Sequence, residues 1–224
     1  MDFQQIQLKQ NNSNALKNNY INHVFEDKSG VMWIATERFG VNKLIPKNKP
    51  FKLIGEANPA YSDLKNINTI IADKSGDLLI GTRGNGLFKY EFSSNSKPDS
   101  FEGKLLKLNW TNHKNIRSLI RDDEENYWLA VANQGIHVFN KNEKLIHKFV
   151  HDPTNSNSLS DNYVFKIFQD SRGMVWIGTW GGSWGGGLDM YNPKTNTFIN
   201  FCNDPNDDVS LTSSAYFEVK RPCS

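Results

Sequence analysis

Hydrophobic residues in this chain fall in short runs that are separated by polar turns, and no segment keeps the helical period of about 3.6 residues. The runs follow one order. An almost continuously apolar run, such as residues 67–72, leads into Asp-x-x-Gly, and the next run opens on a large side chain, such as Trp33. A glycine and an apolar residue then start a third run, and a fourth run ends the unit. This order predicts four short antiparallel strands per unit and almost no helix.

The same unit occurs four times in succession. Its turn aspartates are Asp27, Asp73, Asp122 and Asp170, which lie 46, 49 and 48 residues apart. A unit of this length with several short strands is typical of a β-propeller blade. We therefore predict an all-β fold, a β-propeller segment with four complete four-stranded antiparallel blades and one partial strand set at each end.

Both ends of the chain align with the middle of the repeat. Residues 3–8 align with the last strand of a unit at 198–203, and residues 211–219 repeat the lead-in at 159–167. The whole chain, 1–224, is therefore interpreted as one propeller segment from a longer array. Its predicted parts are a partial blade at 1–17, blades at about 18–57, 64–109, 113–151 and 160–203, and a partial blade at 211–220.

Such a segment leaves apolar blade faces uncovered, because a propeller covers these faces by closing a ring. We therefore expect an open arc that binds the remaining blades of a parent propeller or associates with itself. A compact four-bladed ring is the alternative.

Tryptophans open the second strand in three of the four units. We expect Trp33, Trp128 and Trp176 to be buried between neighbouring blades. The second repeat has Leu79 at this position, so its interface is expected to be less well filled. In the third repeat Glu125 replaces the turn glycine, and its turn is expected to be built differently.

The repeated string N-x-(V/I)-x-x-(I/L/F)-x-x-D-x-x-G-x-(L/V/M)-W-(I/L)-(G/A)-T, followed by a glycine and an apolar residue, resembles the two-component regulator propeller repeat. The phrases at 151–162 and 203–212 are similar to the linkers between blades of that family. The family builds the extracytoplasmic sensor region of bacterial hybrid two-component histidine kinase/response regulator receptors. The resemblance implies a seven-bladed ring in the periplasm, followed in the parent receptor by a membrane helix and a kinase.

The function that this resemblance implies is non-catalytic sensing of an oligosaccharide or a related signal. Because the chain lacks kinase motifs, we expect no enzymatic activity from it, whereas a full-length parent would be a sensor histidine kinase. Two alternatives stay open, a protein–protein interaction scaffold and a propeller enzyme such as a lyase, because propellers host all three functions.

Composition and charge exclude several classes of partner. The formal net charge is +2, and the 26 basic and 24 acidic residues are spread along the chain, so we expect no nucleic acid partner. No apolar run is long enough for a membrane helix, and the N-terminus lacks the regions of a signal peptide. Cys202 and Cys223 are interpreted as two unpaired thiols. We expect no cofactor and no metal, since the five histidines show no metal-ligand spacing.

The loops between the second and third strands are the predicted ligand site, because they share a face with the linkers between blades. Aromatic rings suit the apolar face of a sugar, while amides and guanidinium groups hold its hydroxyls or carboxylates. The loop that carries Trp180 and Trp184 contacts a ligand or partner, or alternatively packs on its own blade. The candidate ligand-binding residues are Arg38, Phe39, Arg83, Asn85, Asn133, Gln134, Trp180 and Trp184.

Three other patterns are weaker. The G-x-S-x-G string at 181–185 precedes a strand and not a helix, which argues against a nucleophile elbow. The acidic stretch at 204–208 lacks the glycine and glutamate of a calcium loop and is interpreted as a turn. The first strands also align a polar column, which faces either water in a central channel or hydrogen-bond partners in neighbouring strands. This column comprises His23, Thr69, Ser118 and Lys166.

Overall fold

The computed structural model describes residues 16, 18–28, 30–44, 52–54, 59–93, 103–180, 187–201 and 210–211. The chain divides into two compact units, Met1–Ile116 and Arg117–Ser224. Within the described ranges each unit holds two four-stranded antiparallel sheets. One short 3-10 helix, η1 (Pro59–Tyr61), is the helical element of these ranges, and it is far too short to cross a membrane.

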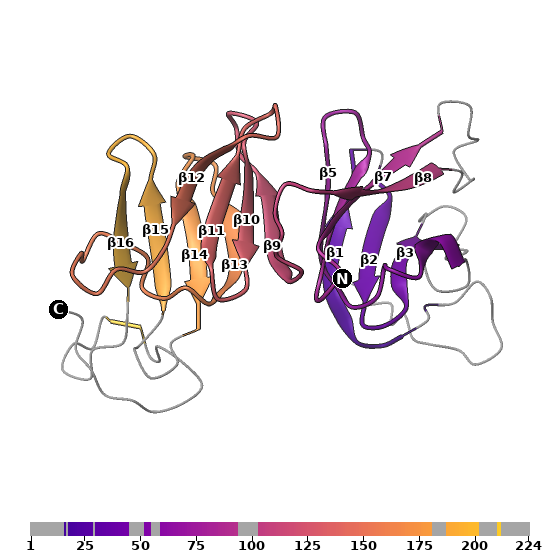
Figure 1. Cartoon of the computed structure of the whole chain (residues 1–224), viewed down its shortest axis with the longest axis horizontal. Helices are drawn as coiled ribbons and strands as arrows, with labels where there is room; N and C mark the ends of the chain where they lie inside the picture. Colours follow the sequence, from indigo (N-terminus) through magenta and orange to yellow (C-terminus); the bar gives the residue numbers. More distant parts are fainter. Residues whose placement is uncertain are drawn as a thin grey trace, which may run out of the picture. The chain divides into compact units, whose positions relative to one another are not determined.

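Each sheet is a meander in which every strand pairs with its neighbours in sequence (Figure 1). The first unit contains β1 (Ile21–Glu26), β2 (Met32–Thr36), β3 (Gly40–Leu44) and β4 (Lys52–Ile54), then β5 (Ile67–Ala72), β6 (Leu78–Thr82), β7 (Leu87–Phe92) and β8 (Gly103–Leu108). The second unit contains β9 (Ile116–Arg121), β10 (Tyr127–Val131), β11 (Gly135–Phe139) and β12 (Leu145–Phe149), then β13 (Val164–Gln169), β14 (Val175–Thr179), β15 (Leu188–Asn192) and β16 (Thr197–Phe201). The predicted all-β fold with four propeller blades is confirmed. Most of the predicted terminal strand sets lies outside the described residues.

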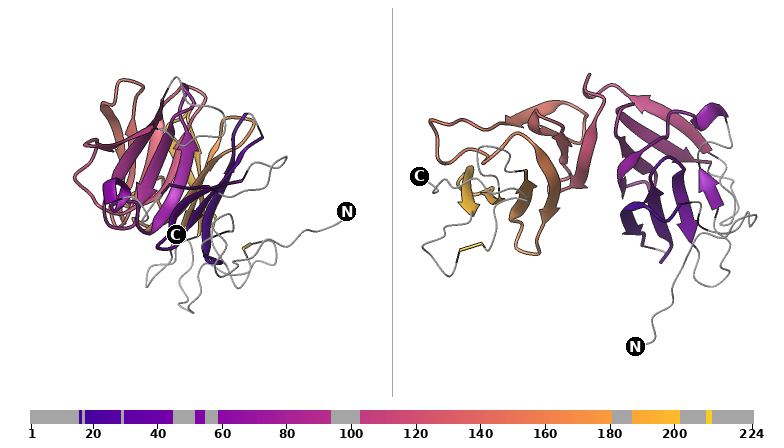
Figure 2. Two further views of the ribbon diagram at one scale, coloured as in Figure 1. Left: turned by 90° about the vertical axis from the view of Figure 1, so that its right-hand side faces the viewer. Right: turned by 90° about the horizontal axis from the view of Figure 1, so that it is seen from below.

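The two sheets of each unit lie next to each other (Figure 2), and buried apolar side chains of both sheets form one cluster in each unit. In the first unit Ile67 and Ile70 of β5 pack in one cluster with Trp33 of β2. In the second unit Val164 and Ile167 of β13 pack with Trp128 of β10. In each unit the first strand of the second blade, β5 or β13, is therefore covered by the first blade, as its apolar sequence predicts.

A hydrogen bond from the tryptophan ring to the turn aspartate recurs in three blades. The indole N–H donates to the aspartate Oδ2 at 2.9 Å from Trp33 to Asp27, at 2.8 Å from Trp128 to Asp122 and at 3.0 Å from Trp176 to Asp170. In the fourth blade this bond and those from Arg172 and the turn amides hold the pKa of Asp170 below its usual range. The aspartate thus fixes both the turn and the ring that follows it.

Trp33 and Trp128 are 3% and 5% exposed, as predicted, but Trp176 is only half-buried. Trp128 is covered by side chains of the following blade, whereas the described part of the chain supplies no following blade over Trp176. Trp176 stacks instead on Phe201, with ring centroids 5.9 Å apart.

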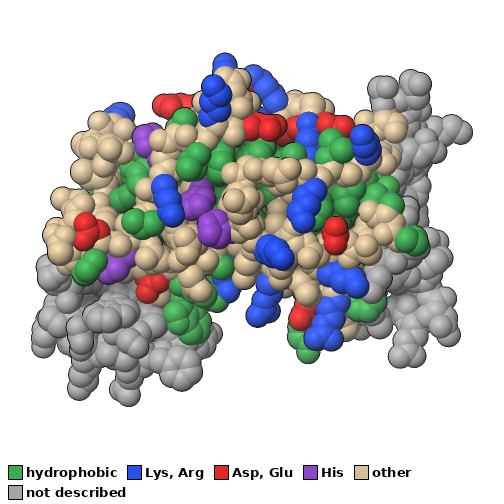
Figure 3. All heavy atoms as spheres, viewed as in Figure 1, with side chains coloured by type: hydrophobic (Ala, Val, Ile, Leu, Met, Phe, Trp, Pro, Cys, Tyr) green, Lys and Arg blue, Asp and Glu red, His purple; other side chains and the backbone are tan. Residues whose placement is uncertain are grey.

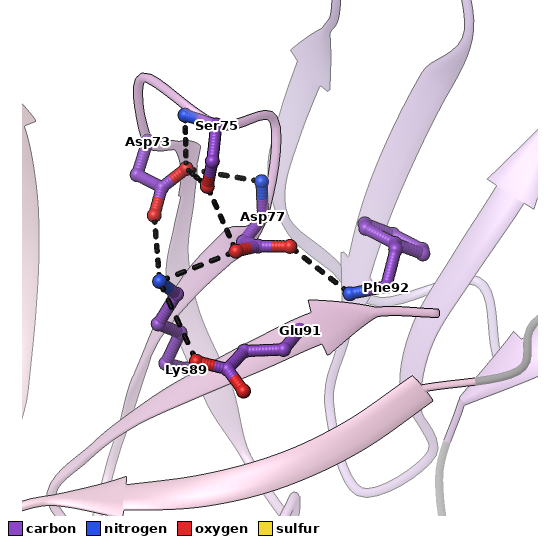
Figure 4. A network of polar contacts seen from close by, with 6 residues as sticks. All are labelled: Asp73, Ser75, Asp77, Lys89, Glu91 and Phe92. Atoms are coloured by element: carbon purple, nitrogen blue, oxygen red, sulfur yellow. Dashed lines mark hydrogen bonds and ion pairs between the residues drawn. The ribbon is translucent and has the colours of Figure 1, made fainter. Parts of the chain in front are cut away.

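In the second blade a lysine takes over the contact that the tryptophan indole makes with the turn aspartate in the other blades. Leu79 is 2% exposed, and the expectation of a less well filled interface at this blade stays a prediction. Lys89, which pairs with Leu79 across β6 and β7, reaches the turn, where its Nζ lies 3.1 Å from Asp73 Oδ2 and 3.2 Å from Asp77 Oδ2 (Figure 4). Burial acts to lower the pKa of Lys89, but the hydrogen bonds to the two carboxylates outweigh it and raise that pKa above its usual value.

The turn of the third blade has the same geometry as the others. Glu125 adopts φ +69°, close to φ +81° at Gly173, and its N–H donates to Asp122 O at 3.0 Å. The expectation of a different turn is therefore wrong. The backbone carries a non-glycine residue in the left-handed region because the aspartate cap and the strand pair determine this conformation.

The polar column of the first strands is partly resolved. Thr69 and Ser118 are fully buried, and Ser118 Oγ accepts the N–H of Ile167 in the next blade at 3.1 Å. For Ser118 the structure therefore shows a hydrogen bond between neighbouring strands and no contact with water.

We predict that Trp128→Ala lowers the free energy of unfolding by about 3–5 kcal/mol, because it empties a covered interface between blades. Trp176→Ala is the matched control and should cost clearly less, since its ring is half exposed. Urea unfolding followed by circular dichroism measures both. Equal losses would contradict the assignment of the covered face.

We predict that Lys89→Met lowers the free energy of unfolding by about 1–2 kcal/mol at neutral pH, because the carboxylates of Asp73, Asp77 and Glu91 lose their cation. The lowered pKa of Asp77 means that its contribution is present above the unfolded-state pKa and is lost as the pH falls through the folded-state pKa. The difference between variant and native chain should therefore shrink in acid. The exposed Lys107→Met is the control, and a Lys89→Met penalty that does not change with pH would refute the ion-pair account.

We predict that Glu125→Gly raises the free energy of unfolding by up to about 1 kcal/mol, because glycine relieves the left-handed conformation. Gly173→Ala at the equivalent turn should lower it by about 1 kcal/mol. No steric clash intervenes there, since the nearest atom to an added Cβ is 3.9 Å away. Thermal melts of both variants test the pair, and a Glu125→Gly variant less stable than the native chain would be the contrary result.

Candidate functional site

The loop after the second strand of a blade is tied to the residue that enters the first strand. In three blades the first loop residue donates its N–H to that entry residue, with distances of 2.8–3.1 Å. These pairs are Glu37 to Tyr20 O, Arg83 to Asn66 O and Trp180 to Tyr163 O. The predicted loop positions and the segments that lead into each blade therefore form one surface on each blade.

The candidates in the first unit lie in two such loops. Arg38 has φ +68° and a side chain 76% exposed, and Phe39 is 39% exposed. Arg83 is also exposed, and its backbone pairs with Asn115. Asn85 ties its loop to the segment that leads into β5, because its Nδ2 donates to Asp63 O at 2.8 Å.

The candidates in the second unit divide in the same way. Asn133 adopts φ +59°, and the N–H of Gln134 donates to Val131 O at 2.9 Å, so these two residues build the turn between β10 and β11. Trp180 follows β14 and is 37% exposed. Trp184, the cysteines and the acidic stretch at 204–208 lie outside the described residues.

A β-bulge near the start of the first strand re-aims one side chain in three blades. The pairing register shifts around Asn22, Asn68 and Phe165. Asn22 Nδ2 donates to Ile67 O at 2.7 Å, and Asn68 Nδ2 donates to Ile116 O at 3.0 Å, so both amides reach the strand that follows. Phe165 cannot donate such a bond, and its ring is 40% exposed. Bulges of this kind commonly redirect a side chain at functional sites.

Four side chains of the second unit, Arg117, Tyr163, Phe165 and Trp180, form what we call the aromatic cluster. The ring centroids of Phe165 and Trp180 are 5.4 Å apart at an interplanar angle of 55°. Tyr163 lies 5.2 Å from Phe165 at 70° and 6.2 Å from Trp180 at 56°. These tilted contacts hold the two exposed rings in fixed orientations.

Arg117 supplies the charge of the cluster. Its guanidinium carbon lies 4.0 Å from the ring centroid of Tyr163 and 5.2 Å from that of Phe165, and its Nη2 donates to the Tyr163 hydroxyl. The nearby Asp161 accepts the Tyr163 N–H at 2.6 Å and so has a structural partner. On the face of the molecule drawn in Figure 3, basic and acidic side chains are interspersed. The cluster therefore combines exposed rings with a cation that is stacked on aromatic faces.

Asp189 is a second unusual group that the sequence reasoning missed. It is fully buried, accepts Ser160 N and Oγ at 3.0 Å each, and accepts Asn200 Nδ2 at 2.8 Å. Burial raises the pKa of Asp189, although these hydrogen bonds act in the opposite direction. Because Ser160 belongs to the linker before the fourth blade, we interpret Asp189 as an anchor for that linker and not as a reactive group.

Sequence reasoning placed Trp180 at the site but missed Arg117, Tyr163 and Phe165. The signal was available as a departure from the repeat. At three aligned positions the fourth blade carries an aromatic residue where the second and third blades do not. From the first to the fourth blade, the residues at these positions are Tyr20, Asn66, Asn115 and Tyr163; Asn22, Asn68, Arg117 and Phe165; and Glu37, Arg83, Ala132 and Trp180.

Comparison with known proteins gives the family of the repeat. The two component regulator propeller family matches residues 15–38 and 158–181. These segments contain the entry, first strand, turn and second strand of the first and fourth blades. Histidine kinase P4 of Formosa agariphila is 26% identical over 154 residues, which is 66% of this chain and 10% of that protein.

Solved structures agree. The extracellular domain of BT3049, a hybrid two component system of B. thetaiotaomicron, is 26% identical with a TM-score of 0.62 over 86% of this chain and 24% of its own. The extracellular domain of BT4673 from the same organism is 26% identical with a TM-score of 0.57 over 76% of this chain and 21% of its own. PorZ of Porphyromonas gingivalis, 14% identical with a TM-score of 0.64 over 93% of this chain and 31% of its own, shares the fold.

The chain spans a quarter or less of the first relatives that it matches, and the kinase part of Histidine kinase P4 lies outside the matched region. Repeat, blade structure and relatives agree with one another and with the resemblance inferred from the sequence. The chain carries the two-component regulator propeller repeat and is similar to the extracellular domains of hybrid two-component systems.

Proposed function

We propose that this chain is a ligand-binding part of the extracytoplasmic sensor region of a two-component receptor, and that it recognises an oligosaccharide without converting it. The aromatic cluster is the observation that carries the proposal. Its two exposed rings, Phe165 and Trp180, offer apolar faces that match the C–H face of a sugar ring.

Binding suits the chemistry around the cluster better than catalysis. The carboxylates of the blade already have structural partners: Asp170 accepts the Trp176 indole, Asp161 accepts the Tyr163 amide, and the buried Asp189 holds the linker. An acid and base that converge on exposed substrate would need carboxylates without such roles. A stacked, rigid set of rings is what a binding site requires.

A periplasmic location is part of the proposal. It is supported by the similarity to extracellular domains of two hybrid two-component systems, each 26% identical to this chain. An oligosaccharide outside the cytoplasm would be accessible to a propeller placed there, and the signal would pass to a kinase in the parent receptor.

The partner that we propose for the fourth blade is a further blade of the same repeat. Phe168, Ile199 and Phe201 are 60%, 48% and 38% exposed, and the first two belong with Trp176 to one row of paired residues across the sheet. The equivalent row of the third blade, which contains Trp128, is the face that the fourth blade covers. A further blade of the same repeat would therefore fit this exposed row as the fourth blade fits the third.

The test is a screen of neutral and acidic oligosaccharides against the full chain, read as the shift of the thermal unfolding midpoint. A ligand that binds only the folded chain at about 100 times its Kd stabilises it by about 2.7 kcal/mol. We expect at least one saccharide class to raise the midpoint and to be recovered intact by chromatography. Cleavage of the saccharide, or no stabilisation by any class, would contradict the proposed function.

A further inference from the structure

The exposed rings of the aromatic cluster form a corner that is specific to the fourth blade. Phe165 and Trp180 are 40% and 37% exposed and meet at 55°. Leaving a large apolar ring exposed to water costs free energy. Two adjacent exposed rings that are held in fixed orientations therefore indicate a surface that a ligand covers. Because the two rings are tilted, they suit one sugar ring that stacks on Trp180 and contacts Phe165 with its edge better than they suit an extended flat ligand.

Arg117 adds a cation under this corner. In the first two blades the residue at this position is an asparagine, whose amide bonds the following strand. Arg117 instead lies against the rings of Tyr163 and Phe165, with its guanidinium carbon 4.0 Å and 5.2 Å from their centroids. A guanidinium that is stacked in this way keeps its positive charge, which attracts a carboxylate or a sulfate ester.

The two features lie close together because of the backbone. The bulge in β13 turns Phe165 towards the surface, and the hydrogen bond of 2.8 Å from Trp180 N to Tyr163 O fixes the second ring beside the entry to the same strand. Tyr163 contacts all three other members, so it sets the spacing between the rings and the cation. The cluster is therefore preorganised, which lowers the cost of ordering a bound ligand.

We propose that the aromatic cluster binds an acidic sugar unit, with the ring stacked on Trp180 and Phe165 and its carboxylate or sulfate group held by Arg117. This proposal rests on the proposed function and specifies its ligand as anionic. Carboxylate and sulfate share the charge and the oxygen acceptors that Arg117 recognises, so the experiment tests both.

The experiment is calorimetric titration of the full chain with three probes of matched length: oligogalacturonides, sulfated galactan oligosaccharides and neutral galactan oligosaccharides. We expect one acidic probe to bind about tenfold or more tightly than the neutral one, and the preference to weaken with added salt. Phe165→Ala and Trp180→Ala should each weaken binding of the acidic probe about tenfold or more, because a stacked ring is lost.

Two variants separate the cluster from general effects. Ile146→Ala is the control, since Ile146 is an exposed apolar residue of β12 that is not a member of the cluster, and its binding should equal that of the native chain. Arg117→Gln should remove the preference for the acidic probe, while Arg117→Lys keeps the charge and should retain part of it. Circular dichroism melts of each variant show whether it is folded.

The possible failures can be told apart. If neutral and acidic probes bind equally and Arg117→Gln changes neither, the proposed function stands and the acidic specificity falls. If a probe binds and folded Phe165→Ala and Trp180→Ala variants bind it as the native chain does, the site lies elsewhere and the inference is overturned. If no saccharide binds at all, the proposed function and this inference both fail.

Discussion

The hydrogen bond between a turn aspartate and a tryptophan indole is the interaction on which the blades depend. It joins the end of the first strand to the start of the second, at 2.8–3.0 Å in three blades. Because the aspartate also caps the turn amides, one carboxylate fixes the hairpin and the plane of a large ring at once. That ring is then presented to the neighbouring blade, and burial of Trp33 and Trp128 provides much of the packing between the sheets.

The second and third blades show how far this constraint tolerates other residues. Leu79 takes the place of the tryptophan in the second blade. There the ammonium group of Lys89 binds the carboxylate of the turn aspartate, Asp73, and also pairs with Asp77. Where Glu125 replaces glycine, the backbone keeps the left-handed turn and accepts the local strain. At Leu79 a neighbouring side chain, Lys89, thus compensates for the departure from the repeat. The aromatic departures of the fourth blade leave two rings exposed, which is why we propose that they bind a ligand.

Much of the fold could be predicted from the sequence because the repeat supplies the pattern four times. Strand order, turn positions and the buried roles of Trp33 and Trp128 follow from periodicity and turn chemistry. Lys89 as a replacement for the indole could not be predicted, since its reach to Asp73 depends on its pairing with Leu79 across two strands. At the site, loop position identified Trp180, but Phe165 depends on a bulge and Arg117 on a contact between blades, and neither is encoded by local sequence alone. Asn85 and Asn133 are ligand donors by sequence position alone; in the structure the Asn85 amide donates to Asp63 O, and Asn133 adopts φ +59° in its turn.

Three tryptophan rings are held by a turn aspartate, whereas the ring of Trp180 faces outward, and indole N–H exchange measured by NMR tests this division directly. At neutral pH the indoles of Trp33, Trp128 and Trp176 should exchange slowly, and Asp122→Ala should accelerate the exchange of the Trp128 indole. The indole of Trp180 should exchange rapidly in both chains. A Trp180 indole as protected as that of Trp128, or a Trp128 indole whose exchange is unchanged in a folded Asp122→Ala variant, would contradict this division.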